Sequence, residues 1–294
     1  MASHLHDVIR RHCRPLEPVP TGTTPALRFL PGIRAVLFDI YGTLFLSASG
    51  DVGTAIRQGQ AQAFEEALEA AGISAKIDGQ TGANCLLAEI QAEHKQLRSN
   101  RVEFPEVEIV EIWRKTLNSL CEQGWLPAEA CSVDLRQLAV EYEVRANPVW
   151  PTPDARECLA RLRKEGKILG LVSNAQFFTI ELFPALFGEP AEELGFDRQL
   201  QYFSYQYAQA KPGEFLYRRA AEELEQRGME TSEALYVGND LLNDVLPAKR
   251  VGFRTALFAG DARSLRLRKD DPRVQDVAPD LIVTDLVSLA DCVC

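Results

Sequence analysis

The chain alternates between short apolar runs and longer amphipathic stretches. Six runs are rich in residues that favour strands, and they cover residues 34–40, 167–174, 201–207, 234–240, 253–259 and 280–286. Most of the segments between them repeat apolar residues at the spacing of a helix. Strands that alternate with helices form parallel sheets with helices on their faces. The pattern therefore predicts an α/β fold built around a parallel sheet.

The first two runs are separated by more than a hundred residues, which is too long for a simple crossover between strands. Apolar residues in this gap recur at helical spacing: Ala55, Ile56, Ala63, Phe64, Ala67, Leu68, Ala71, Leu86, Leu87, Ile90, Leu97, Ile109, Trp113, Leu117 and Leu120. The gap therefore predicts an inserted helical domain. Its expected edges are the small, polar residues 47–53 and the proline-rich residues 147–153, which suit hinges.

The N-terminus predicts a separate segment. Residues 4–13 have the pattern of a short basic helix, and the prolines after them cannot continue it. We expect this arm either to be mobile or to dock on a partner subunit. The chain is thus divided into an N-terminal arm (residues 1–32), a sheet core (33–46 and 150–294) and a helical insertion (47–149).

Composition narrows the possible functions. The formal net charge of -10 argues against a general nucleic-acid or anionic-membrane binder. The chain has no run of about 18 apolar residues and no signal-peptide core, so no membrane segment is expected. The seven cysteines are scattered and lack zinc-type pairs, which predicts reduced thiols in a cytoplasmic protein. We expect a small-molecule, anionic substrate, and either a monomer or a homodimer.

Candidate chemistry lies where the apolar runs end, because ligands of open α/β sheets sit beyond the carboxyl ends of the strands. Asp39 ends the first run, directly before a turn at residues 41–43. A carboxylate there serves as a metal ligand, a nucleophile or a cap for the turn. Ser173 and Asn174 end the second run, where they either donate hydrogen bonds to an anionic substrate oxygen or cap a helix.

Two later stretches add charged groups. Lys211 precedes a proline that disfavours helical geometry at the lysine, and it either neutralises a carboxylate and a phosphate or lies in a solvated loop. Asn239, Asp240 and Asp244 follow an apolar run, and the two acids are four residues apart. With a carboxylate from another strand, such a pair supplies the oxygen ligands that Mg²⁺ requires. The alternative is a helix N-cap with an acid in the first turn.

Together and in this order, the four stretches resemble the motifs of the haloacid dehalogenase superfamily of hydrolases, over roughly residues 34–290. The resemblance implies a Rossmann-like core with an α-helical cap inserted between the first and second motifs. Cap closure would then exclude water after the substrate enters. The resemblance implies that Asp39 is the nucleophile and that the further catalytic residues are Tyr41, Ser173, Asn174 and Lys211. It implies substrate contacts from Thr43, Ser173, Asn174 and Lys211. The implied Mg²⁺ ligands are Asp39, Tyr41, Asn239, Asp240 and Asp244.

Tyr41 departs from the pattern of the family's phosphatases. Most of them carry a second aspartate two residues after the nucleophile, which protonates the leaving alcohol and later deprotonates the attacking water. Tyrosine, with an ordinary pKa of ~10, is a poor proton relay near neutral pH. A tyrosine at this position is the pattern of the dehalogenase branch, in which halide leaves without a proton.

The fourth motif favours the opposite interpretation. The dehalogenase branch typically replaces the metal-binding acids with a Ser-Ser-Asn cluster, whereas this chain keeps Asp240 and Asp244. The family also accepts a pair of acids that are five residues apart. With that spacing, Asn239 stands where the earlier of the two acids would be, so the metal site is expected to be weakened. Retained acids favour phosphoryl transfer, because Mg²⁺ is most useful for a substrate with spread negative charge.

The sequence therefore predicts a hydrolase, with a Mg²⁺-dependent phosphatase that forms an aspartyl-phosphate ahead of a 2-haloacid dehalogenase that forms an aspartyl ester. A third hypothesis is a catalytically idle member that binds a ligand through its cap. The basic residues 262–273 are expected to be a solvated face rather than a clamp for an acidic ligand. His94 is expected on the cap surface, and Trp113 in its core.

Overall fold

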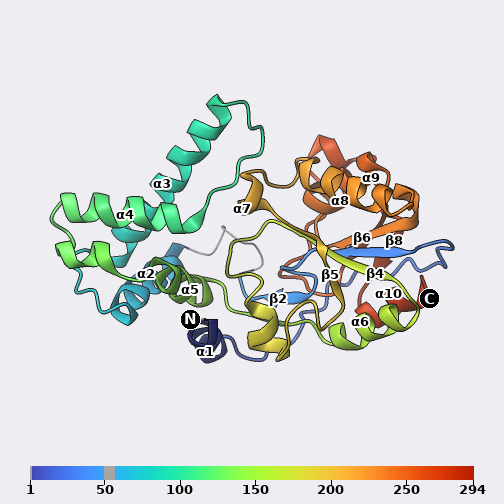
Figure 1. Ribbon diagram of the computed structural model, residues 1–294, viewed down its shortest axis with the longest axis horizontal. Helices are drawn as coiled ribbons and strands as arrows, with labels where there is room; N and C mark the ends of the chain where they lie inside the picture. Colours follow the sequence, from blue (N-terminus) through green and yellow to red (C-terminus); the bar gives the residue numbers. More distant parts are fainter. Residues whose placement is uncertain (1, 50–56) are drawn as a thin grey trace.

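The computed structural model describes residues 2–49 and 57–294, with side chains described for residues 4–49 and 59–294 (Figure 1). Two of the predicted helical positions, Ala55 and Ile56, and the last four residues of the first expected hinge, 50–53, lie outside the described residues. The described chain forms a six-stranded sheet with helices on both faces, and a group of helices that extends to one side of it.

The main sheet is parallel throughout, in the strand order β5-β4-β1-β6-β7-β8. Its strands are β1 (Ala35–Phe38), β4 (Ile168–Ser173), β5 (Phe196–Phe203), β6 (Ala234–Gly238), β7 (Arg254–Phe258) and β8 (Leu281–Val283). All four residues of β1 are buried, as expected for a central strand covered on both faces. The order reverses at β1, which separates β4 from β6, so the carboxyl end of β1 is a topological switch point.

Helices cover the two faces of the sheet (Figure 1). The helices α8 (Phe215–Gln226) and α9 (Leu246–Val251) lie on one face, and α6 (Ala155–Lys164) and α10 (Leu286–Asp291) lie on the other. Shorter turns complete the core: η2 (Phe183–Phe187), α7 (Ser204–Tyr207), η3 (Thr231–Glu233), η4 (Leu241–Val245) and η5 (Pro272–Val274). This arrangement confirms the predicted α/β fold with a parallel-sheet core.

The cap consists of helices inserted between β1 and β4, as the sequence predicts. It contains α2 (Arg57–Ala70), α3 (Gly79–Ser99), α4 (Ile109–Glu122), the turn η1 (Ala128–Ser132) and α5 (Leu135–Ala146). Trp113 is fully buried at its centre, where it stacks on Phe64 with ring centroids 5.5 Å apart and meets Tyr142 edge-on at 5.5 Å. Trp113 is therefore a core residue of the cap, as expected.

A two-stranded antiparallel ribbon joins the cap to the core. It pairs β2 (Phe45–Ser47) with β3 (Val149–Pro151). Asn147 ties the two connections together, because its amide oxygen accepts hydrogen bonds of 2.6 Å from the hydroxyls of both Ser47 and Ser49. The two chain crossings between cap and core are thus held side by side at one place.

The N-terminal arm packs on its own chain. Its helix α1 (Ala2–His12) buries Val8 and Ile9 between the cap helix α5 and the core turn η2. Farther along the arm, Ala26 pairs with Ile282 of β8 and so covers one edge of the sheet. The arm therefore packs on its own chain, which was neither of the two expectations, and docking on a partner subunit stays untested.

One predicted strand lies earlier in the chain than expected. Residues 201–207 were expected to form a strand, but β5 ends at Phe203 and residues 204–207 form the helix α7. The change of direction lets Ser204 turn back and donate its hydroxyl to Glu106 of the cap at 2.8 Å. Among the described residues, no helix combines the length and the apolar character needed to cross a membrane.

Candidate active site

Asp39 follows β1 at the switch point of the sheet, and only 6% of its surface is exposed. Its Oδ1 atom accepts hydrogen bonds from the Ser173 hydroxyl and from the Lys211 ammonium group, each at 2.8 Å. Ser173 reaches it because β4, which ends at Ser173, pairs directly with β1. Within the described part of the chain, no hydrogen bond or ion pair involves Oδ2. One carboxylate oxygen is therefore fixed and the other is available for reaction.

Lys211 is the charge centre of the site. Its buried Nζ atom lies 2.8 Å from Asp39 Oδ1, 2.6 Å from Asp244 Oδ1 and 3.2 Å from the Tyr236 hydroxyl. Burial by itself lowers the pKa of Lys211, but the charges of Asp244 and Asp39 outweigh burial and raise this pKa above its ordinary value. The ammonium group is therefore kept charged between two carboxylates.

Asn174 holds the backbone of Lys211. The side-chain oxygen of Asn174 accepts a hydrogen bond from the Lys211 backbone N–H at 2.7 Å, and its amide group donates to the Lys211 carbonyl at 3.3 Å. Both ends of the Asn174 amide are thus used to fix the loop that carries the lysine. Its expected role on the substrate stays a prediction.

The two acids of the fourth motif point to different cations. Asp244 pairs with Lys211, and its second oxygen accepts the backbone N–H of Asp240 at 2.9 Å. Burial raises the pKa of Asp244 to about 7 despite its contact with Lys211. Asp240 caps the turn η4 through the backbone N–H groups of Leu242 and Asn243, and it pairs with Arg268 at 2.5 Å. Both carboxylates are thus occupied by protein groups.

Asn239, rather than Asp240, faces the turn after β1. Its side-chain oxygen accepts the Thr43 hydroxyl at 3.3 Å, and its amide group donates to the Ser264 carbonyl at 2.6 Å. The contact requires glycine at position 42, where φ is +77° and a Cβ atom would lie 2.7 Å from the Asn239 amide nitrogen. Thr43 is fully buried, and its expected contact with substrate stays a prediction.

These contacts test the fit of a magnesium ion. No cluster of three or more His, Cys, Asp or Glu side chains within the described ranges suits a metal ion. Of the oxygens expected to hold it, Asp39 Oδ2 has no hydrogen bond within the described structure, and the side-chain oxygen of Asn239 accepts a 3.3 Å contact from Thr43. Protein sites for Mg²⁺ often use one or two carboxylates together with substrate phosphate. The donor set therefore fits a weakly held ion that a bound phosphate completes, and it does not fit an ion held by Asp240 and Asp244.

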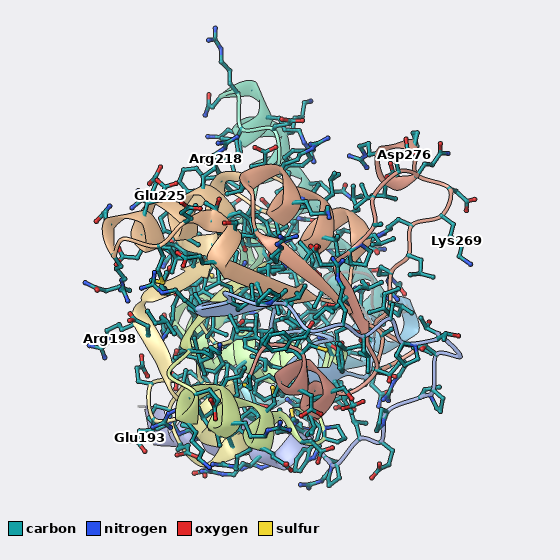
Figure 2. All side chains as sticks on the ribbon, turned by 90° about the vertical axis from the view of Figure 1, so that its right-hand side faces the viewer. Glu193, Arg198, Arg218, Glu225, Lys269 and Asp276 are labelled. Carbon is teal, nitrogen blue, oxygen red and sulfur yellow. The ribbon has the colours of Figure 1, made fainter. Side chains whose placement is uncertain are left out.

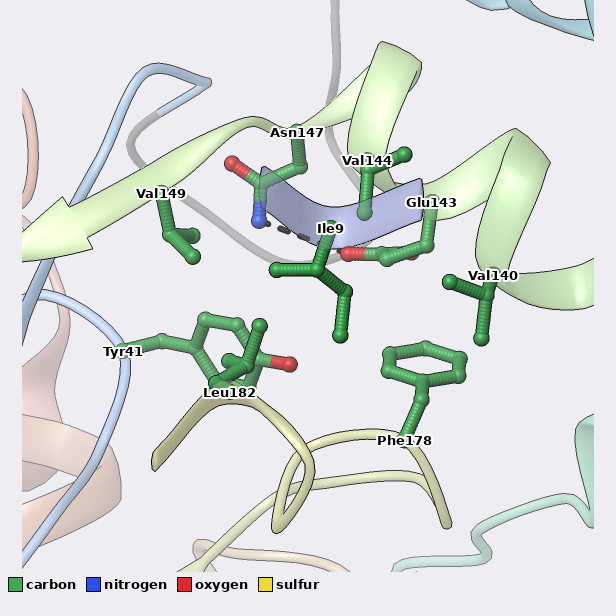
Figure 3. Close-up of a pocket in the computed structure, with 9 residues that line it drawn as sticks. All are labelled: Ile9, Tyr41, Val140, Glu143, Val144, Asn147, Val149, Phe178 and Leu182. Atoms are coloured by element: carbon green, nitrogen blue, oxygen red, sulfur yellow. Dashed lines mark hydrogen bonds between the residues drawn. The ribbon is translucent and has the colours of Figure 1, made fainter. Parts of the chain in front are cut away.

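The side chain of Tyr41 lines a small cavity of about 10 Å³ (Figure 3). Its hydroxyl lies 3.0 Å from the Thr179 hydroxyl, and Ile9 of α1 and Glu143 of α5 line the same cavity. Burial, with a contribution from the Glu143 carboxylate, raises the pKa of Tyr41 well above 10. Tyr41 is therefore unsuited to exchange protons near neutral pH.

A larger cavity of about 340 Å³ opens between the cap and the core. Apolar side chains such as Leu86, Ile90 and Phe178 line most of it, and it reaches the main site at Tyr41 and Asn174. Its size suits a small organic molecule. Among the described residues around it there is no lysine or arginine. The cavity thus forms an apolar chamber beside Tyr41 and Asn174, two residues of the predicted site.

Two buried acids also line this cavity. Glu106 accepts hydrogen bonds from Ser204, from the Val107 backbone N–H and from the Gln176 amide, at 2.8, 2.9 and 3.3 Å. Burial raises its pKa, although these donors oppose the change. Burial also raises the pKa of Glu143, to about 7. Neither acid belongs to a sequence motif, so pattern analysis did not select them.

Two other residues differ from their expected surroundings. His94, expected on the cap surface, is only partly exposed and lines the larger cavity, where its Nε2 atom is buried without a hydrogen-bond partner in the described structure. Arg268 was expected on a solvated face, but it reaches the fourth motif through its ion pair with Asp240. Lys269 in the same segment does extend from the surface, as does Asp276 just beyond it (Figure 2).

Comparison with known proteins agrees with the motif pattern. The model of a family of hydrolases, described as haloacid dehalogenase-like hydrolase, matches residues 33–252. No curated protein gives a significant match to the chain. The match spans the cap and most of the core, including every predicted site residue.

Solved structures share the fold at low sequence identity. A 2-haloacid dehalogenase from Pseudomonas syringae pv. Tomato DC3000 is 20% identical, with a TM-score of 0.56, over 88% of this chain and 97% of that one. A HAD phosphatase from Thermococcus onnurineus is 19% identical, with a TM-score of 0.51, over the same shares. Identities this low establish the likeness of the fold alone.

Proposed function

The chain belongs to the haloacid dehalogenase-like hydrolase family, and we propose that it is a phosphatase of a small organic phosphate ester, with Asp39 as its nucleophile. The distribution of charge supports this choice. Lys211 supplies a fixed positive charge beside Asp39, whereas no lysine or arginine lines the described part of the apolar cavity. A phosphate ester matches both features, because its anionic group meets Lys211 and its organic part enters the cavity.

The proposed reaction has two steps. Asp39 Oδ2 attacks phosphorus, the bond to the ester oxygen breaks, and an aspartyl-phosphate forms while the alcohol leaves. Water then attacks the phosphorus of this intermediate, and inorganic phosphate and the Asp39 carboxylate are released. The hydrogen bonds from Ser173 and Lys211 to Oδ1 orient the carboxylate for the first attack. The charge of Lys211 reduces the repulsion between Asp39 and the anionic phosphate.

A magnesium ion would neutralise further charge on the phosphate when bound. The residues that would hold it are Asp39, the backbone carbonyl of Tyr41 and Asn239, with the phosphate of the substrate as an additional ligand. Asp240 and Asp244 would act on this region indirectly, through the hydrogen bond and the turn that join them. The proposal therefore predicts a weak requirement for magnesium rather than a tightly bound ion.

The nucleophile provides the decisive experiment. Asp39→Asn is expected to fold normally and to lose turnover of phosphate esters completely, because the amide cannot form the aspartyl-phosphate. Phosphate release from a panel of small esters, with and without magnesium, measures this loss, and circular dichroism checks the fold. Asp276→Asn, on an exposed loop, is the matched control. Substantial turnover by pure Asp39→Asn protein would rule out the mechanism.

A second candidate is the dehalogenase, and one observation favours it. The ion pairs of Asp240 with Arg268 and of Asp244 with Lys211 leave the fourth motif without a free carboxylate within the described chain. In that reaction Asp39 would displace halide from carbon, and water would then hydrolyse the aspartyl ester. Halide release from 2-chloropropionate that persists in EDTA, without phosphate release from any ester of the panel, would establish this alternative.

A further inference from the structure

Two cysteine sulfurs meet on the surface of the cap. The Cys131 thiol donates a hydrogen bond to the Cys121 sulfur at 3.0 Å, and the Cys121 thiol donates to the Pro127 carbonyl at 3.3 Å. Cys121 lies in the last turn of α4, and Cys131 lies in the turn η1. Both are free thiols, and Cys131 is exposed while Cys121 is partly exposed. The structure thus joins two of the scattered cysteines into a pair.

We propose that Cys121 and Cys131 form a redox modification site, in which a peroxide converts the two thiols into a disulfide that fastens η1 to the end of α4. A thiol reductant reverses the change. A disulfide bond is about 2.05 Å long, so the two sulfurs, which lie 3.0 Å apart, must approach by about 1 Å. The proposal does not depend on the phosphatase function.

The chain between the two cysteines is folded in a way that keeps their sulfurs together. The Trp125 backbone N–H donates to the Leu120 carbonyl at 2.9 Å, and the Ala130 N–H donates to the Pro127 carbonyl at 3.0 Å. Leu120 and Ala130, which directly precede the two cysteines, are both buried in the hydrophobic core. Because the backbone is fixed beside each cysteine, the two thiols meet within one ordered loop, and their reaction is effectively unimolecular.

Exposure decides which of the two thiols reacts first. Cys131 is exposed and meets a peroxide from solution. Burial and the neighbouring Cys131 thiol raise the pKa of Cys121 to about 11, and a thiol with so high a pKa is a weak nucleophile near neutral pH. Cys131 is therefore the thiol that the peroxide oxidises. Cys121 then closes the disulfide, because its step takes place within the loop and needs no encounter from solution.

The atoms and electrons balance with hydrogen peroxide as the oxidant. The Cys131 sulfur attacks one peroxide oxygen, the oxygen–oxygen bond breaks, and the products are a sulfenic acid and water. The Cys121 sulfur then attacks the sulfenic sulfur and the sulfur–oxygen bond breaks, so that hydroxide leaves with the Cys121 proton as a second water. The two sulfurs together lose two electrons, and the peroxide gains them.

The disulfide closes a loop at one end of a core helix of the cap. The helix α4 carries Trp113 and Leu117, and both are fully buried. A cross-link stabilises a fold mainly because it restricts the unfolded chain, and the gain depends on the length of the closed loop. For the short loop between Cys121 and Cys131, oxidation is expected to raise the melting temperature by about 5–10 °C. The modification would thus protect the cap against unfolding under oxidising conditions.

Peptide mapping detects the bond directly. The full chain is treated with hydrogen peroxide, alkylated without reduction and cut with trypsin, which releases both cysteines in one peptide of residues 116–136. This peptide is expected to be lighter by two hydrogen atoms and to carry no alkyl group. Further cleavage after Glu129, which lies between the cysteines, should leave two pieces that stay joined until a thiol reductant separates them.

Three variants complete the test. Cys121→Ser and Cys131→Ser each remove one sulfur, so both should lose the cross-link and the rise in melting temperature after peroxide treatment. The two are independent, and either is sufficient if the other fails to fold. Cys85→Ser is the matched control, because Cys85 is a partly exposed thiol on α3 of the same cap. This variant should keep both the cross-link and the rise.

The results that would overturn the proposal are distinct. In the first, both thiols of the peptide remain open to alkylation after peroxide treatment. In the second, Cys131 is oxidised beyond the sulfenic acid without a cross-link, or joins a second copy of the chain. In the third, the cross-link forms but leaves the melting temperature unchanged or lowers it, which would show that the bond does not fasten the cap.

Discussion

Replacing Lys211 by methionine tests whether this residue holds the charges of the site together. The substitution keeps the length and apolar stem of the side chain and removes its ammonium group. In the wild type this group contacts Asp39 at 2.8 Å and Asp244 at 2.6 Å, and only 3% of the lysine side chain is exposed. The variant therefore leaves two buried carboxylates without their shared cation.

The expected loss follows from that burial. Removing one partner of a buried ion pair typically lowers the free energy of unfolding by about 3–5 kcal/mol. The loss should depend on pH through Asp244, whose folded-state pKa of about 7 lies above its ordinary value. A group with a raised pKa stabilises the fold when it is protonated, and this contribution is lost as pH rises through the folded-state pKa. Without Lys211 the pKa of Asp244 rises further, so the loss is larger at about pH 8 than at about pH 5.

Urea unfolding of the wild type and of Lys211→Met at both pH values measures these losses. Lys249→Met is the matched control, because Lys249 is 39% exposed and lies 3.8 Å from Asp280. Its loss should be about 0–1 kcal/mol at both pH values. Adding Asp244→Asn to Lys211→Met should recover part of the stability. A loss below about 1 kcal/mol, or an equal loss at both pH values, would refute the assignment of Lys211 as the charge centre.

Three further predictions address the surroundings of Asp39. Arg268→Gln removes the cation that pairs with Asp240, so the magnesium concentration for half-maximal phosphatase activity should fall, and an unchanged titration would contradict the ion pair. Gly42→Ala places a Cβ atom 2.7 Å from the Asn239 amide at a φ of +77°, so it should lower the melting temperature in differential scanning calorimetry. Tyr41→Phe removes the hydroxyl bonded to Thr179 and should lower the free energy of unfolding by about 0.5–1.5 kcal/mol in urea.

The sequence by itself determined the class of fold and the order along the chain of the motifs that carry the candidate site residues. Alternating runs predicted the parallel sheet, and the long gap after Asp39 predicted the inserted helices, because the periodicities of strands and helices are local properties. The positions of Asp39, Ser173 and Lys211 could be connected because parallel strands all end at one edge of a sheet. The structure brings these three side chains together through Asp39 Oδ1.

Tertiary structure decided which groups meet across long distances in the chain. The sequence could not show that Arg268 forms an ion pair with Asp240, or that the side-chain amide of Asn174 forms hydrogen bonds with the backbone of Lys211. Nor could it place Glu143 beside Tyr41, since that contact exists because the cap folds back over the core. Burial in the chamber so formed raises the pKa of Glu143 to about 7, and burial depends on every neighbour of a residue rather than on its place in a repeat. Local patterns therefore selected Asp39 as the candidate nucleophile, while the buried surroundings of Glu143 became visible only once cap and core were assembled.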